Sequence, residues 1–188
     1  DEKNNQENFY SYRVINSIHE IKKSSTTKYY PTTLSECLNE VKKSDYKYAI
    51  VGLPCFVKGL RLLMLEDSTF KDKIQFCISI VCGGLKSKFF TDYLAQKSGI
   101  KHNSFINPKY REKITSDKAS RYNFQAFDTL DDKIKTQPMW TLGDMWGTGL
   151  FKANACDFCD DVTGETADIS IGDAWVQKSH AFALNNPV

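Results

Sequence analysis

The chain has 188 residues and a formal net charge of +2, and 41% of its residues are hydrophobic and 13% aromatic. This length and composition are typical of one substantial globular domain and exclude a largely disordered chain. The lysines are too dispersed for the basic surface that binds nucleic acid, and the apolar stretches are shorter than the ~20 residues of a membrane span.

Six cysteines in a chain of this length are either paired in disulfides or available to a metal site. A secreted disulfide scaffold is usually small and loop-rich, whereas this chain has apolar patterns that can build a core without cross-links. We therefore expect a cytoplasmic protein with reduced thiols. The chain starts without Met and shows no secretory signal, so residues 1–23 are predicted to be a lead-in that continues a missing N-terminal region.

The principal domain is predicted to span residues 24–176. Thr33 has the character of a helix N-cap with Glu36 three residues later, and apolar residues then recur at helical spacing. Residues 48–52 form an apolar run typical of a buried strand, which ends in the turn-like sequence Gly-Leu-Pro-Cys at residues 52–55.

A second buried strand is predicted at residues 74–81, ending at Cys82-Gly83-Gly84, and a helical pattern follows each of the two turns. This order describes a βαβ unit, in which parallel strands place both turns at the carboxyl edge of the sheet. Cys55 and Cys82 are therefore expected to lie near each other.

The rest of the chain is more β-rich in pattern. Residues 104–107 and 122–127 resemble half-exposed strands, and residues 167–175 form a further apolar strand. Residues 177–188 have no clear pattern and form an unplaced tail. We predict an α/β (α+β) fold: a mixed sheet with βαβ units flanked by helices, plus a smaller β-rich, cysteine-containing C-terminal portion.

Two cysteines lie in apolar elements, and four lie in turn-like positions. Cys37 and Cys77 are predicted to be inert core residues, because buried thiols behave as small hydrophobic groups. The other four supply a complete set of thiolate ligands for one metal centre: Cys55, Cys82, Cys156 and Cys159. The last two form a C-x-x-C pair, a spacing at which two sulfurs can bind one metal or cluster.

Glycine and proline flank the two isolated cysteines, and we assign these residues to cofactor binding: Gly52, Pro54, Gly83 and Gly84. They let the backbone turn sharply, so that N–H groups can point at an anionic cluster. Zinc and a 4Fe-4S cluster both accept four thiolates, so the ligand type alone does not distinguish a zinc site from an iron–sulfur site. Structural zinc sites usually pair two C-x-x-C sequences, whereas here two ligands are isolated on separate strand ends, which favours iron–sulfur.

Four segments together resemble the beta subunit of coenzyme F420-reducing hydrogenase and F420-dependent dehydrogenases, in that family's order. They are GLPCFVKGLR at 52–61, VCGG at 81–84, ACDFCDD at 155–161 and ADISIGDAW at 167–175. The similarity runs from about residue 24 to residue 175. It implies that the four cysteines ligate the cluster nearest a flavin. It also implies that Lys28 and Tyr29, in a segment similar to the family's Ser-Lys-Tyr, lie near that flavin.

The resemblance implies an oxidoreductase or electron-transfer subunit that binds FAD and a 4Fe-4S cluster. Such a protein passes electrons between a two-electron carrier, for example the deazaflavin F420, and a partner subunit or ferredoxin-like protein; a homo-oligomer is a further expectation. The basic residues that are candidates for an anionic cofactor tail are Lys58, Arg61, Arg111 and Arg121. Turn aspartates crowd the C-x-x-C pair, as partner or cation ligands or as solvated residues: Asp157, Asp160, Asp161 and Asp173.

Two other functions are compatible with the sequence. In the first, the four cysteines bind zinc and hold together a non-catalytic structural module. In the second, the chain is an accessory protein of polysaccharide biosynthesis with the same fold. The residues do not identify a catalytic acid, base or nucleophile.

Overall fold

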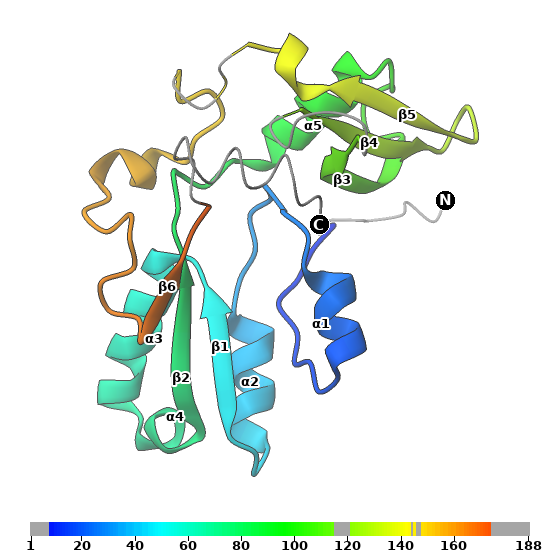
Figure 1. Cartoon of the computed structure of the whole chain (residues 1–188). Helices are drawn as coiled ribbons and strands as arrows, with labels where there is room; N and C mark the ends of the chain where they lie inside the picture. The colour runs from blue at the N-terminus through cyan, green and yellow to red at the C-terminus, as the bar shows by residue number, and fades with distance from the viewer. Residues whose placement is uncertain (1–7, 115–120, 144, 146–147, 174–188) are drawn as a thin grey trace.

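The computed structural model describes four parts of the chain: residues 8–114, 121–143, 145 and 148–173. The described strands fall into two sheets (Figure 1). The first sheet is parallel, with the strand order β1 (Tyr48–Gly52), β2 (Ile74–Ile80) and β6 (Ile169–Ile171). This arrangement confirms the α/β class and the parallel pairing predicted for the first two strands.

Three helices pack on the parallel sheet: α2 (Ser35–Lys43), α3 (Pro54–Glu66) and α4 (Ser68–Lys73). Their apolar side chains and those of the two longer strands form one core, made of Val41, Ile50, Val57, Leu60, Met64, Phe70, Ile74 and Cys77. Cys77 is fully buried there and Cys37 is buried on α2, which confirms that both are core residues.

The other face of the parallel sheet is apolar and exposed. The side chains that alternate with the core residues are Ala49, Val51, Phe76, Ile78, Ile80, Ile169 and Ile171. Phe76 is 40% exposed and Ile171 is 57% exposed. We call these seven residues the outer face, which is the kind of surface that helices cover in most parallel sheets.

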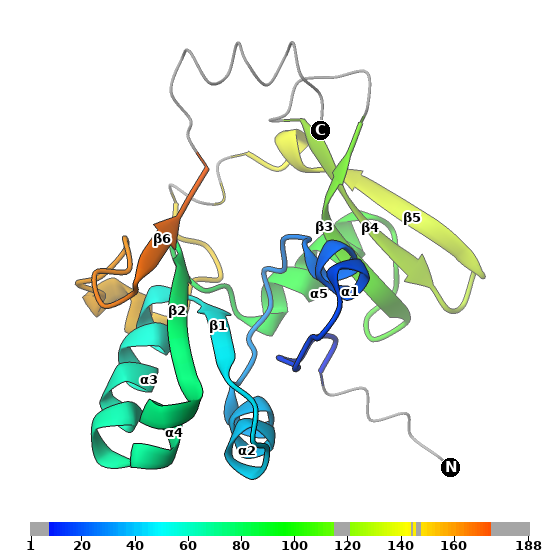
Figure 2. The ribbon, with the colours of Figure 1, turned by 60° about the horizontal axis from the view of Figure 1, so that its bottom comes forward.

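The second sheet is antiparallel, with the order β3 (Phe105–Lys113), β4 (Tyr122–Asp128) and β5 (Lys133–Pro138). Helix α5 (Lys88–Lys97) packs against it, and Figure 2 shows this unit beside the parallel sheet. The second core contains Tyr30, Phe90, Leu94, Ala95, Ile100, Phe105, Tyr110, Phe124, Ala126 and Met145. The described residues therefore form two cores, and the chain that runs from β2 to α5 is one of the segments that join them.

Shorter elements complete the described chain. Helix α1 (Ile18–Ser24) buries none of its residues, whereas Phe9 ahead of it stacks on Phe105 in the second core at a centroid distance of 5.0 Å. Two 3-10 turns follow the antiparallel sheet: η1 (Met139–Thr141) and η2 (Asn154–Phe158). Within the described residues, no helix combines the length and apolarity needed to cross a membrane.

Several local predictions differ from the structure. Parallel and antiparallel strands lie in two separate sheets, and the cysteine-containing segment leads into β6 of the parallel one. The predicted turn at residues 52–55 is the start of α3, because Pro54 suits a first helical turn where its missing N–H costs nothing. The N-cap of α2 is Leu34, although the Thr33 hydroxyl accepts a hydrogen bond from the Ser35 amide at 3.2 Å.

Candidate functional site

The four candidate cysteines come from three segments that meet at the carboxyl edge of the parallel sheet. Cys55 lies in the first turn of α3, directly after β1. Cys82 follows the end of β2 by two residues, Cys156 lies in η2, and Cys159 is the C-cap of η2. Topology thus places Cys55 and Cys82 at the same edge, as the βαβ pattern predicted.

The four thiols lie within electrostatic range of one another. Burial raises the pKa of Cys55, and the charges of Cys82, Cys156 and Cys159 raise it further. Burial also raises the pKa of Cys82, to which Cys156 and Cys159 again contribute. All six cysteines are free, and the Cys55 and Cys159 side chains are exposed.

Backbone amides point at two of the sulfurs. The Gly84 amide donates to Cys82 Sγ at 3.4 Å, and the Leu85 amide donates to Cys156 Sγ at 3.3 Å. One short turn therefore serves sulfurs from two distant parts of the sequence. Such N–H···S bonds favour the negatively charged form of a thiolate site.

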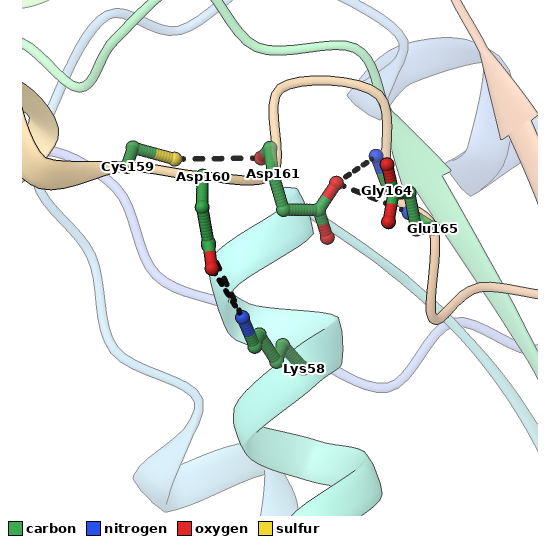
Figure 3. Close-up of polar contacts among 6 residues, drawn as sticks. All are labelled: Lys58, Cys159, Asp160, Asp161, Gly164 and Glu165. Carbon is green, nitrogen blue, oxygen red and sulfur yellow. Dashed lines mark hydrogen bonds and ion pairs between the residues drawn. The ribbon is translucent and has the colours of Figure 1, made fainter.

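Lysine–aspartate pairs flank the C-x-x-C loop. Lys58 on α3 lies 3.1 Å from Asp160 and, as a hydrogen-bond donor, holds the pKa of that carboxyl below its usual value (Figure 3). Lys152 forms an ion pair with Asp157. Asp161 is buried and accepts hydrogen bonds from the amides of Gly164 and Glu165, which shape the loop after Cys159 (Figure 3). Two of these aspartates are therefore paired and one is structural.

The donor chemistry suits a centre held by thiolates, since four free thiols and two sulfur-directed amides occupy one region. In the part of the chain that the structure describes, no three His, Cys, Asp or Glu side chains are grouped closely enough to hold a metal ion. The four thiols therefore lie within electrostatic range of one another without forming a closed metal site, and their role as ligands stays a prediction.

The flanking glycine and proline residues differ in backbone conformation and in the space around them. Gly84 has φ +131°, and a Cβ there would lie 3.1 Å from Cδ of Lys152. Gly83 has open space around it, and a Cβ on Gly52 would meet only ordinary contacts. Pro54 is buried at the start of α3. Of Gly52, Gly83 and Gly84, it is Gly84 at which a side chain would disturb the turn beside the cysteines.

Lys28 and Tyr29 occupy a different environment from the cysteines. The Lys28 ammonium donates to the carbonyls of Ser24 and Thr26 and to the Thr26 hydroxyl, and burial lowers its pKa. Burial raises the pKa of Tyr29 to about 12, and Arg111 opposes that shift. Lys28 therefore stabilises its own loop, and its predicted contact with a flavin stays a prediction.

Arg111 connects the two sheets. Its guanidinium lies 3.1 Å from Asp173, just after β6, and 4.9 Å from the ring centroid of Tyr122 on β4. Arg61, another basic candidate, pairs with Asp168 at 2.7 Å. These arginines and Lys58 are thus engaged by carboxylates, while Trp175 of the same motif lies outside the described residues.

Two lysines near the cysteines were not identified from the sequence. Lys86 is 2% exposed, donates to the carbonyls of Met145 and Leu150, and lies 5.5 Å from the ring centroid of Phe90. Lys152 forms an isolated antiparallel bridge with Lys86. A lysine in a polar stretch carries no periodic signal, so its burial is visible only in the folded chain.

A shallow depression of about 320 Å³ lies beside Cys55, between the start of α2 and α3. Its lining includes Thr33, Leu38, Phe56 and Leu63. The depression is mostly apolar in its lining and of a size within the range of small-molecule sites.

Known proteins resemble this chain in sequence and in fold. The family model that describes the C terminus of the coenzyme F420 hydrogenase/dehydrogenase beta subunit matches residues 45–184. An uncharacterized protein of Methanocaldococcus jannaschii, MJ1349, is 21% identical over 154 residues, which is 77% of this chain and 37% of that protein. The fold is shared with a chain of the F420-reducing NiFe hydrogenase complex from Methanosarcina barkeri, with a TM-score of 0.53 and 18% identity over 83% of this chain and 50% of that chain. The chain thus spans at most half the length of these two relatives.

Proposed function

Because the chain belongs to the coenzyme F420 hydrogenase/dehydrogenase beta-subunit family, we propose that it is an electron-transfer module of a flavin-dependent oxidoreductase. In this proposal Cys55, Cys82, Cys156 and Cys159 hold a 4Fe-4S cluster. FAD binds beside the cluster, and a deazaflavin such as F420 is the two-electron substrate. When bound, these groups would supply the exchange between two-electron and one-electron chemistry.

The observation that carries the proposal is the gathering of the four thiols at one sheet edge, together with two amides that donate to sulfurs. The chain's own residues have two tasks there. They supply the thiolates, and they direct backbone N–H groups at the sulfurs. Hydrogen bonds and burial of this kind set the potential of an iron–sulfur centre.

A partner is part of the proposal. Phe158 lies between the two cysteines of the C-x-x-C pair and is 89% exposed. Exposed aromatic residues are enriched at contact surfaces between proteins. Phe158 would thus lie at the contact with an electron-transfer subunit or ferredoxin-like protein.

A cysteine substitution series tests the proposal. Each of the four cysteines is changed to Ser in protein produced and purified without oxygen, and iron and acid-labile sulfide are measured per chain. We expect each change to remove most of the bound iron. Cys37→Ala is the matched control, because Cys37 is buried on α2 and interacts with Glu40 and Tyr12 rather than with the four thiols.

The alternatives give different results. Iron that survives all four Ser substitutions would contradict the proposed ligands. One zinc per chain that is lost on the same substitutions would support the structural module instead.

A further inference from the structure

Lys152 contacts both of the loops that carry Cys82 and Cys156. Its backbone pairs with that of Lys86 in an isolated antiparallel bridge, and the next amide, of Ala153, donates to the Leu85 carbonyl at 2.8 Å. Its ammonium pairs with Asp157, inside the C-x-x-C sequence. One residue thus ties the turn after Cys82 to the loop that contains Cys156.

The hydrocarbon part of Lys152 covers the turn itself. A Cβ built on Gly84 would lie 3.1 Å from Cδ and 3.2 Å from Cγ of Lys152, so a side chain on Gly84 would crowd the lysine stem. Gly84 and Leu85 are the residues whose amides donate to Cys82 Sγ and Cys156 Sγ. The stem therefore lies beside Gly84, in the turn whose amides point at the sulfurs.

The charge of Lys152 also acts on the site. A hydrogen bond from Lys152 to Asp157 raises the lysine pKa, and the negative charges of Asp157 and Cys156 add to the effect. The Lys152 side chain as a whole is 29% exposed. A cation near a thiolate-bound centre favours the more negative, reduced state.

We propose that Lys152 is a positioning residue that clamps the turn at residues 83–85 against the Cys156 loop. The clamp keeps two backbone amides on two ligand sulfurs and thereby raises the reduction potential of the centre bound there. This inference rests on the proposed function for the cluster, but the clamp itself is a property of the chain alone.

Two substitutions separate the stem from the charge. Lys152→Met keeps most of the stem and removes the charge, whereas Lys152→Ala removes both. We expect both to shift the midpoint potential of the cluster to more negative values in a redox titration followed by electron paramagnetic resonance. Lys152→Ala should give the larger shift, about a tenfold fall in the equilibrium constant for reduction or ~59 mV for a one-electron couple.

Lys58 provides the matched control. It forms the equivalent ion pair with Asp160 on the other side of the C-x-x-C loop, yet its stem is not among the atoms that a Cβ built on Gly83 or Gly84 would meet within 4 Å. Lys58→Met and Lys58→Ala should therefore shift the potential equally. If Lys152→Ala and Lys152→Met also shift it equally, or not at all, the clamp is wrong.

A second readout needs no cluster. Hydrogen exchange of the Gly84 and Leu85 amides, followed by NMR in metal-free protein, should be faster in Lys152→Ala than in wild type and unchanged in Lys58→Ala. Unchanged exchange in Lys152→Ala would overturn the clamp. Wild-type protein that binds no iron would overturn the proposed function, while the exchange measurement would still decide the inference.

Discussion

Gly84 is the residue whose backbone most restricts substitution at the cysteine site. Its φ of +131° lies in a region that L side chains rarely adopt, and a Cβ there would lie in tight contact with the Lys152 stem, 3.1 Å from Cδ. Gly84→Ala is expected to lower the free energy of unfolding by about 1–2 kcal/mol. Gly83 has open space around it, so Gly83→Ala should lower the free energy of unfolding by less than about 0.5 kcal/mol. Urea denaturation of both variants measures the two free energies. Equal costs would show that the turn does not depend on Gly84.

Asp168 ties β6 to the core of the parallel sheet. Its carboxylate accepts a hydrogen bond from the Cys77 amide at 2.7 Å and forms an ion pair with Arg61 at 2.7 Å. The hydrogen bond from Cys77 is the main reason that the pKa of Asp168 is lowered. A carboxyl whose pKa is lower in the folded chain than in the unfolded chain stabilises the fold at pH values above the unfolded-state pKa of ~4. This stability is lost as the pH falls through the pKa of the folded state.

Asp168→Asn should therefore destabilise the chain by about 1 kcal/mol at pH 7, a value reduced for partial exposure. The difference in the free energy of unfolding between wild type and variant should disappear as the pH falls below ~4, and urea denaturation at several pH values measures it. Asp45→Asn, at an exposed aspartate, is the control. A gap that is constant with pH would contradict the assigned role of the charge.

The parallel sheet is buried on one face and exposed on the other. Truncating a side chain to Ala should therefore lower the free energy of unfolding by different amounts on the two faces. Phe70 on α4 is 6% exposed in the core, whereas Phe76 on the outer face is 40% exposed. Phe70→Ala should cost about 3–5 kcal/mol because it leaves a cavity. Phe76→Ala should cost about 1 kcal/mol or less, since little buried surface is lost.

Thermal or urea unfolding of the two phenylalanine variants tests this account of the sheet. Similar costs would mean that the outer face is covered in solution. A lower tendency of Phe76→Ala to self-associate is a second expected result, because exposed apolar patches promote association.

The elements with apolar patterns were the ones that the sequence predicted well. β1 and β2 are short apolar runs, and their parallel pairing followed from the helix between them. β5 was missed because its residues are mostly polar and none is buried, so pairing with β4 determines its structure rather than any periodicity of its own. The position of Cys55 and Cys82 at one edge followed from topology, whereas the contacts of Lys86 and Lys152 depend on tertiary packing.

At the scale of the whole molecule, the cysteines lie where the two cores are connected. The chain from Cys82 to Ser87 leads from the parallel sheet to α5, and the segment after η1 returns beside it (Figure 1). Ser87 and Phe151 are joined by a backbone hydrogen bond of 2.8 Å at this crossing. A centre bound by cysteines from both segments would therefore link the two halves of the fold.

Metal loading should consequently raise the thermal midpoint of the whole molecule. A ligand that binds the folded chain and not the unfolded one adds a stability of RT ln(1 + L/Kd), where L is the free ligand concentration. Differential scanning calorimetry of loaded and metal-free protein, without oxygen, measures the change. A midpoint unaffected by loading would show that the metal does not bind preferentially to the folded chain, which would contradict a centre built from cysteines of both segments.

The most direct test of the central claim is the visible spectrum of the wild-type chain purified without oxygen, with iron and sulfide measured on the same sample. The account predicts broad absorbance near ~400 nm that bleaches with dithionite, and about four irons per chain, as a cluster on four thiolates requires. A colourless protein that holds one zinc would contradict it.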